Sequence, residues 1–223
     1  MKNNRDHAGI DGTHLLEDLG ACVAQEYFGP GTEGFVFGAR PGDAGFGERV
    51  NELCAELGEG GQYADWRTQS SSPKDGKLDV AVWKHFADRL PGKIIAFGQC
   101  KTGTSYRNEL EQLQPDSFCK KWMRDFPAVT PVRMFFVAEA TPRDGVYSLA
   151  ADAGVVFDRC RIVEYCGGVD EDVLARLESW TAAAAGSAEL GVGRAASTGH
   201  GYHQSRRTAD RSKAESVETT SKW

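Results

Sequence analysis

The chain has 223 residues, of which 40% are hydrophobic and 10% aromatic, and its formal net charge is −6. This length and composition suit a soluble globular protein of one ordinary domain with extensions. They exclude a membrane span, because no apolar run approaches the roughly 20 residues that a transmembrane helix needs. The N-terminus lacks an apolar signal-peptide core, so the protein is expected to stay in the cytoplasm. The acidic balance excludes binding to nucleic acid by bulk charge alone.

The six cysteines and five histidines form no zinc-binding pattern. The cysteines are scattered among apolar neighbours without a CxxC pair, and the histidines do not pair into a ligand motif. Most of the thiols are therefore expected to be reduced and buried.

Two helices are predicted in the first quarter of the chain. Apolar residues recur at helical spacing over residues 14–28, with Thr13 as the expected N-cap. The glycine-rich stretch over residues 34–45 predicts a loop or hairpin. Residues 46–57 carry a second apolar stripe, and Gly58 ends this helix.

Three strands are predicted next, over residues 62–69, 78–86 and 94–101. The turn between the first two and the proximity of the third predict an antiparallel meander. In the second strand Leu78, Val80 and Val82 are expected to share one apolar face.

The remaining elements alternate between helix and strand. A helical pattern returns over residues 105–125, where Pro115 is expected to break or kink the helix. The chain then predicts an apolar strand over residues 131–140, a short helix over 144–154, one or two strands over 155–166, and a closing helix over 170–185 capped by Asp170.

These elements add up to a three-layer α/β domain with a mixed central sheet over residues 13–185. Residues 1–12 are expected to be a flexible N-terminus. Residues 186–223 contain too few large apolar groups to offset the entropy of ordering, so a disordered tail is predicted.

The end of the third predicted strand is unusually polar. Gln99 and Lys101 point to the same face of this strand, and Cys100 points to the other face. Asp79 lies inside an apolar strand, where a charge is costly unless it is paired or ligates something. If the two strands pair near their ends, these side chains meet in one patch, and Glu48 in the first turn of the second helix can overhang it.

These residue types suit the hydrolysis of a phosphodiester with Mg²⁺. The ion prefers oxygen ligands and keeps several waters, so Asp79, Glu48, the side-chain oxygen of Gln99 and the carbonyl of Cys100 are candidate ligands. A bound metal lowers the pKa of its water, and Lys101 can orient that water and offset the developing charge.

Simpler interpretations of the same residues remain open. Asp79 and Lys101 can form a plain, partly buried ion pair, and Gln99 can be a strand-end amide satisfied by backbone. Glu48 can be a charge favoured by the helix dipole. Glu52 is the alternative helix carboxylate, and Asp75, in the preceding turn, can be mistaken for the catalytic aspartate.

The segments "GKLDV" and "FGQCKTG" resemble the motifs of the PD-(D/E)XK nuclease superfamily, in particular its Mrr-like restriction endonucleases, in which glutamine replaces the usual glutamate. The match consists of Asp79, the Q-x-K at Gln99 and Lys101, and the helix glutamate Glu48. It covers about residues 46–140. The resemblance implies a restriction-endonuclease-like α/β/α core in the order helix, three-stranded meander, helix and strand. It also implies Mg²⁺ as cofactor, with Mn²⁺ able to substitute.

The function expected from the resemblance is that of a metal-dependent DNA endonuclease, an effector of a bacterial restriction or antiphage defence system. The alternative is a catalytically silent nuclease-fold protein that binds nucleic acid or a partner subunit. The residues do not separate DNA from RNA. No specificity module is recognisable. A homo-oligomer, a dimer or larger, is therefore expected, with the N-terminal helix among its contacts, or a second defence-system protein that targets or activates the nuclease.

Overall fold

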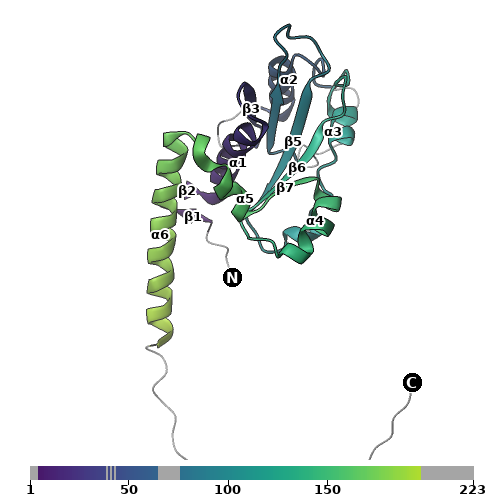
Figure 1. Ribbon diagram of the computed structural model, residues 1–223. Coiled ribbons are helices and arrows are strands. Elements are labelled where there is room, and N and C mark those ends of the chain that lie inside the picture. Colours follow the sequence, from purple (N-terminus) through teal and green to yellow (C-terminus); the bar gives the residue numbers. More distant parts are fainter. Residues whose placement is uncertain (1–4, 39, 41, 43, 65–75, 197–223) are drawn as a thin grey trace, which may run out of the picture. The chain divides into compact units, whose positions relative to one another are not determined.

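The computed structural model describes residues 5–38, 40, 42, 44–64 and 76–196 (Figure 1). Contacts divide the chain into a compact unit, Met1–Ala185, and a second unit, Gly186–Trp223. The central sheet and all the described site residues belong to the first unit.

A five-stranded mixed sheet forms the centre of this unit. The strands lie in the order β3 (Thr32–Val36), β4 (Val80–Lys84), β5 (Ile94–Lys101), β6 (Val132–Val137) and β7 (Val155–Phe157). The first three pair antiparallel, whereas β6 and β7 continue parallel to β5. This arrangement confirms the prediction of an α/β protein with a mixed sheet. A separate ribbon joins β1 (Asp6–His7) to β2 (Ile10–Asp11).

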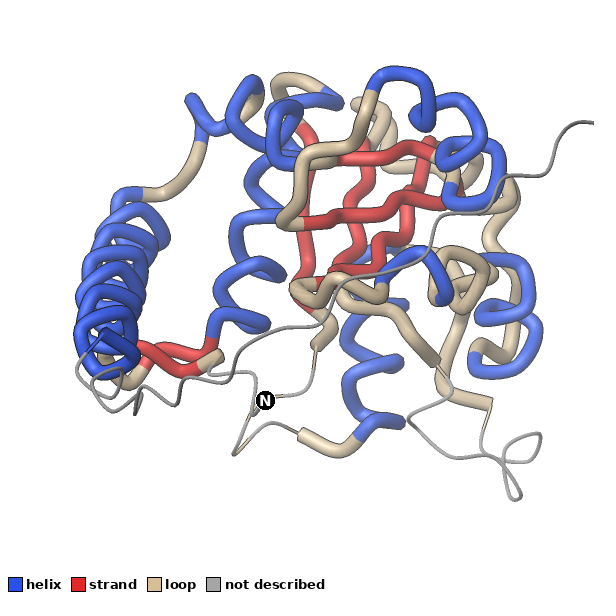
Figure 2. Tube along the Cα trace, turned by 90° about the horizontal axis from the view of Figure 1, so that it is seen from below, coloured by secondary structure: helices blue, strands red, loops and turns tan. Residues whose placement is uncertain are grey.

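Helices cover both faces of the sheet (Figure 2). On one face α1 (Gly12–Phe28) packs in the same apolar cluster as Val80 of β4. On the other face α2 (Phe46–Leu57) and α3 (Pro115–Trp122) pack in the cluster that contains Ala81. Successive strand residues are therefore both buried, because alternate side chains face opposite layers. The sheet with helices on both faces is compatible with the predicted three-layer core.

Short helices and turns and a long C-terminal helix complete the described part of the chain. They are η3 (Tyr106–Asn108), η4 (Arg143–Gly145), α4 (Val146–Ala153), α5 (Arg159–Glu164), η5 (Cys166–Gly168) and α6 (Glu171–Ala196). Among the described residues, no helix combines the length and the apolar character that crossing a bilayer requires.

The first strand of the meander is β3, and not the predicted segment 62–69. Residues 65–69 lie outside the described residues, and Tyr63 belongs to no strand but forms an isolated β-bridge with Met123, directly after α3. Gly34 weakens the strand signal of β3 in the sequence. A Cβ at Gly34 would lie 2.9 Å from the side chain of Gln25 on α1, so this glycine lets the helix approach the strand closely.

Leu78 does not share a face with Val80, contrary to the predicted alternation. It belongs to the cluster on the α2 side, whereas Val80 belongs to the cluster on the α1 side. The carbonyl of Asp79 accepts the N–H groups of both Phe37 (2.7 Å) and Gly38 (3.1 Å). Two residues opposite one is the pattern of a β-bulge, which interrupts the alternation of side chains just before β4.

Two predicted helix boundaries and one predicted strand are wrong, each for a local reason. The N-cap of α1 is Asp11, whose side chain accepts the N–H of Thr13 (2.7 Å). Pro115 begins α3 instead of breaking a longer helix, since the first helical position needs no N–H donor. Part of the predicted final strands forms α5, because Asp158 caps its first turn.

The predicted domain ends also differ from the structure. The closing helix begins directly after Asp170 as expected, but α6 continues through Gly186 to Ala196. The predicted disorder of residues 197–223 concerns residues outside the described ranges. Residues 6–11 form the β1–β2 ribbon within the N-terminus predicted to be flexible. Residues 15–24 of α1 are all buried, so only the ends of this helix are exposed, and the predicted contact between subunits stays a prediction.

A buried ion pair lies directly before β5, at the opposite end of this strand from Gln99. Nζ of Lys93 lies 2.5 Å from Oε1 of Glu59 and also donates to the carbonyl of Leu57 (2.8 Å). The Lys93 side chain is 1% exposed. We expect Lys93→Met to lower the free energy of unfolding by about 3–5 kcal/mol, because it leaves a buried carboxylate without its charge partner. Urea denaturation measures this loss.

The control for this prediction is Arg89→Met. Arg89 pairs with Glu33 at 3.7 Å, but its side chain is 68% exposed. An exposed pair contributes about 0–1 kcal/mol. Equal effects of the two substitutions would contradict a structural role for the Lys93 pair.

Candidate functional site

A cavity of about 560 Å³ opens where β5 ends beside the first turns of α1. Asp79, Gln99, Cys100 and Lys101 line it together, as the sequence predicted. Three further charged side chains in its lining are Glu17 of α1, Arg49 of α2 and Lys77. The adjacent strands β4 and β5 bring the polar residues together through their antiparallel register, which pairs Val80 with Gly98.

Asp79 lies directly before β4 and is held there by the neighbouring strand β5. Its Oδ2 accepts the backbone N–H of Cys100 at 2.7 Å. Burial raises the pKa of the Asp79 carboxyl to about 6, although that hydrogen bond and the charges of Lys101 and Lys77 act in the opposite direction. A carboxylate with this pKa changes its charge readily near neutral pH.

Glu17 is the acidic residue of the cavity that sequence reasoning missed. It is 5% exposed, and burial followed by the charge of Asp79 raises its pKa to about 8. Its Oε2 is buried and has no hydrogen-bond donor among the described residues. A Cβ at Gly38 would collide with this oxygen, so the glycine makes room for the carboxyl group. An unpartnered buried oxygen requires an explanation such as a missing ion or water.

The neighbouring Asp18 shows what a structural carboxylate on the same helix looks like. It accepts hydrogen bonds from Arg40 and from Nη1 of Arg176, the second at 2.8 Å. These two bonds join α1 to the loop that follows β3 and to α6. Asp18 is thus fully paired, whereas Glu17 is not.

Gln99 is 1% exposed, and the two ends of its amide differ. Nε2 donates to Oε1 of Gln112 at 3.1 Å. Oε1 is buried and finds no donor within the described part of the chain. Gln99 and Glu17 therefore each bring one unpartnered oxygen to the same cavity.

Lys101 lines the cavity and is paired on one side. Its Nζ lies 2.5 Å from Oε2 of Glu109, and its side chain is 22% exposed. The ammonium group is therefore accessible and anchored at once, as is required of a cation that acts on an anionic substrate.

The second-helix carboxylates do not reach the cavity. Oε2 of Glu48 accepts the N–H of Gly45 (2.9 Å), so this side chain caps its own helix. Glu52 pairs with Arg49 at 2.8 Å and is exposed. Neither belongs to the lining that the described residues form. The carboxylate that joins Asp79 comes from α1 instead of α2, which corrects the prediction. Asp75 lies outside the described residues.

Cys100 contributes its backbone and not its thiol. Its sulfur lies 3.9 Å from the carbonyl of Leu16, and burial raises its pKa well above the usual range. Such a thiol stays protonated and is a poor nucleophile or ligand. The role of the Cys100 carbonyl as a metal ligand stays a prediction.

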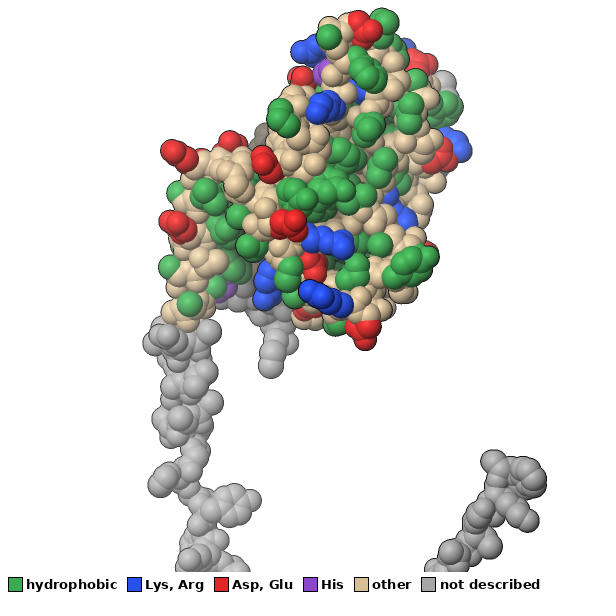
Figure 3. Space-filling view, in the orientation of Figure 1, with side chains coloured by type: hydrophobic (Ala, Val, Ile, Leu, Met, Phe, Trp, Pro, Cys, Tyr) green, Lys and Arg blue, Asp and Glu red, His purple; other side chains and the backbone are tan. Residues whose placement is uncertain are grey.

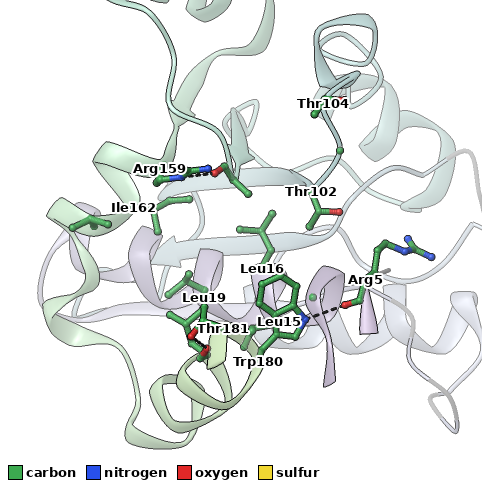
Figure 4. Close-up of a pocket in the computed structure, with 15 residues that line it drawn as sticks. Arg5, Leu15, Leu16, Leu19, Thr102, Thr104, Arg159, Ile162, Trp180 and Thr181 are labelled. Atoms are coloured by element: carbon green, nitrogen blue, oxygen red, sulfur yellow. Dashed lines mark hydrogen bonds between the residues drawn. The ribbon is translucent and has the colours of Figure 1, made fainter. Parts of the chain in front are cut away.

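A second cavity, of about 660 Å³, lies on the other side of the first turns of α1. Figure 4 shows Leu16 and Leu19 of α1 with Ile162 and Trp180 around it, and Arg5 and Arg159 at its edges. No acidic side chain occurs among its described lining residues. It therefore lacks the groups that acid–base or metal chemistry needs, and the polar cavity is the candidate active site.

The polar cavity fits a hard divalent cation. Two carboxylates and an amide oxygen are the ligand types that Mg²⁺ prefers, and the ion fills its other positions with water. Within the described residues no three His, Cys, Asp or Glu side chains are grouped to hold a metal. A cation here would therefore depend on the amide oxygen of Gln99 beside Glu17 and Asp79.

Comparison with known proteins gives this chain no relative. No family model matches it, and neither a curated protein nor a solved structure matches it. A function for the chain must therefore be inferred from the chemistry of its own cavity.

Proposed function

We propose that this protein is a metal-dependent nuclease that hydrolyses phosphodiester bonds in DNA. The observation that carries the proposal is the pair of unpartnered buried oxygens, on Glu17 and Gln99, in a cavity that also contains Asp79 and Lys101. Burying a polar oxygen without a partner costs free energy unless a cation or an ordered water binds it.

The order of elements supports the resemblance to PD-(D/E)XK nucleases of the Mrr-like branch. The helix α1, the antiparallel strands β3 to β5, the helix α3 and the parallel strand β6 follow one another as that core requires. In this proposal the correspondence begins at α1, so Glu17, and not Glu48, is the helix carboxylate of the core. The segment that contains α2 is then an insertion between the first two strands.

Glu17, Asp79 and the side-chain oxygen of Gln99 would hold Mg²⁺, or Mn²⁺ in its place. When bound, the ion supplies a water of lowered pKa and offsets the charge of the phosphate. Lys101 orients the attacking water and stabilises the negative charge that develops on the phosphoryl oxygens. The orientation of Asp79 is fixed by the N–H of Cys100, and the positive charge of Lys101 favours the ionised form of its carboxyl group.

Binding of the nucleic acid would depend on local cations. The face drawn in Figure 3 mixes acidic and basic side chains and has no continuous basic surface. Arg49 and Lys77 line the cavity and can contact phosphates that flank the reacting one. Weak general affinity is consistent with a dimer, which would supply two sites for two strands, or with a second defence-system protein that delivers the substrate.

The test is cleavage of supercoiled plasmid by the purified protein with Mg²⁺, with EDTA, and with Lys101→Ala in place of the wild type. We expect nicked and linear products only from the wild type with Mg²⁺. Parallel reactions on single-stranded RNA decide between the two nucleic acids. A folded wild type that binds DNA but cuts neither substrate would instead support the catalytically silent alternative.

A further inference from the structure

A short segment between β5 and α3 lies against the polar end of β5. Its apolar residues Tyr106, Leu110 and Leu113 are all buried. Tyr106 and Leu110 belong to the cluster of β6, β7 and α4, and Leu113 belongs to the cluster of α2 and α3. These apolar residues anchor the segment to both clusters, whereas Glu109 is half-buried and Gln112 is exposed.

Two polar residues of this segment each contact one residue of the candidate site. Glu109 pairs with Lys101 at 2.5 Å, and Gln112 accepts the Nε2 hydrogen bond of Gln99 at 3.1 Å. The backbone N–H of Gln112 donates to the carbonyl of Glu109 (3.2 Å), so the two residues occupy one turn. A single turn of the chain therefore contacts both Gln99 and Lys101, the two polar residues on one face of β5.

The contact with Gln112 decides which end of the Gln99 amide faces the cavity. An amide is planar, and its nitrogen and oxygen point in different directions. While the nitrogen donates to Gln112, the oxygen is the end left without a protein partner. A cation requires this oxygen, since the NH₂ group has no lone pair to offer.

The contact with Glu109 limits the freedom of Lys101. A lysine side chain has four rotatable carbons and loses much rotamer entropy when it is ordered. The carboxylate of Glu109 holds the ammonium at one side of the cavity. Glu111, on the same turn, is exposed and makes no such contact in the structure as described.

We propose that Gln112 and Glu109 are positioning residues: Gln112 orients the Gln99 amide so that its oxygen faces the cation, and Glu109 fixes the ammonium of Lys101. This inference rests on the proposed function for its catalytic part. The orientation of the Gln99 amide is a property of the protein without metal and can be measured separately.

The experiment combines side-chain NMR with Mn²⁺ binding. The NH₂ resonances of Gln99 are identified by their loss in Gln99→Glu and followed in metal-free protein. We expect Gln112→Leu to shift them and to weaken Mn²⁺ binding by about tenfold, as is usual for residues that orient a ligand. Gln112→Glu retains an acceptor for the Gln99 NH₂ group. It should therefore keep the Gln99 oxygen facing the cavity and the Mn²⁺ affinity within about twofold. The control Gln114→Leu changes a nearby exposed glutamine and should change neither.

The role of Glu109 is tested by measuring kcat and KM separately. We expect Glu109→Gln to lower kcat about tenfold with KM and Mn²⁺ affinity unchanged, and Glu111→Gln to have no effect. Unchanged Gln99 resonances in Gln112→Leu would contradict the role of Gln112 in orienting the Gln99 amide. An unchanged kcat in Glu109→Gln would contradict the role of Glu109 in fixing Lys101. If the wild type binds no Mn²⁺ while the resonances respond as expected, the orientation stands and the proposed metal-dependent function fails.

Discussion

Replacing Asp79 by Asn should lower the rate of DNA cleavage by about 10²–10³-fold, the usual cost of losing one preorganised electrostatic group at a reaction centre. The asparagine oxygen can still accept the N–H of Cys100, so the strand end keeps its hydrogen bond. The substitution removes only the charge that would hold the cation. Single-turnover cleavage of a labelled duplex measures the rate, and circular dichroism checks the fold.

The matched control for this substitution is Asp116→Asn. Asp116 is exposed and pairs with Lys120 one turn along α3, away from the cavity. Its loss should leave the cleavage rate within about twofold, since an exposed pair contributes little. If the folded Asp79→Asn protein cleaved at the wild-type rate, Asp79 would not belong to the site.

The second large effect is expected on stability, from Glu17→Gln. The pKa of Glu17 is about 8 in the folded protein, against a usual value of 4.5. Between these two values the folded state binds more protons than the unfolded state, so the free energy of unfolding falls as pH rises through this window. The full shift corresponds to roughly 5 kcal/mol at 1.36 kcal/mol per unit, and the unsatisfied amide offsets about 1–3 kcal/mol of the gain. We therefore expect Glu17→Gln to be more stable than the wild type at pH 8.5 by about 2–4 kcal/mol, with little advantage near pH 4.5.

For the adjacent residue, Asp18, we expect the opposite effect on stability. Asp18 is paired with Arg40 and Arg176, so Asp18→Asn weakens two charge-assisted hydrogen bonds. The arginine side chains are 35% and 33% exposed and stay solvated, so the expected loss of stability is about 1–3 kcal/mol. Urea midpoints at both pH values for the two variants therefore separate a functional from a structural carboxylate. A loss of stability in Glu17→Gln at pH 8.5 would mean that Glu17 is a structural residue.

The sequence predicts the sheet and the polar end of β5 well, because both depend on local patterns. Apolar runs with polar ends gave β4, β5 and β6 close to their true positions, and the strand period placed Gln99 and Lys101 together. The strand β3 was missed because Gly34 serves a tertiary contact with Gln25, which no local pattern contains. Likewise, the bulge at Asp79 depends on a partner strand more than 40 residues away in the chain.

The local sequence pattern also does not identify Glu17 of α1 as the carboxylate of the site. Glu48 fits the rule for an acidic residue in the first turn of a helix, and this is the role it has. Glu17 breaks a rule instead, since it lies in a helix whose residues 15–24 are all buried. A charge in such a helix indicates a partner or a function. Asp18 satisfies the same description for a structural reason, so only the packing of the helix distinguishes the two.

The most direct test of the cation site is a calorimetric titration of Mn²⁺ into the wild type and into two glutamate variants at pH 7.5. We predict that the wild type and Glu48→Gln bind the ion with the same affinity, and that Glu17→Gln binds it at least about tenfold more weakly, because it loses one of the two carboxyl groups that would hold the ion. Glu48 only caps its helix, so its substitution serves as the matched control. Unchanged binding by Glu17→Gln, or binding lost in Glu48→Gln alone, would contradict a cation site formed by Glu17, Asp79 and Gln99.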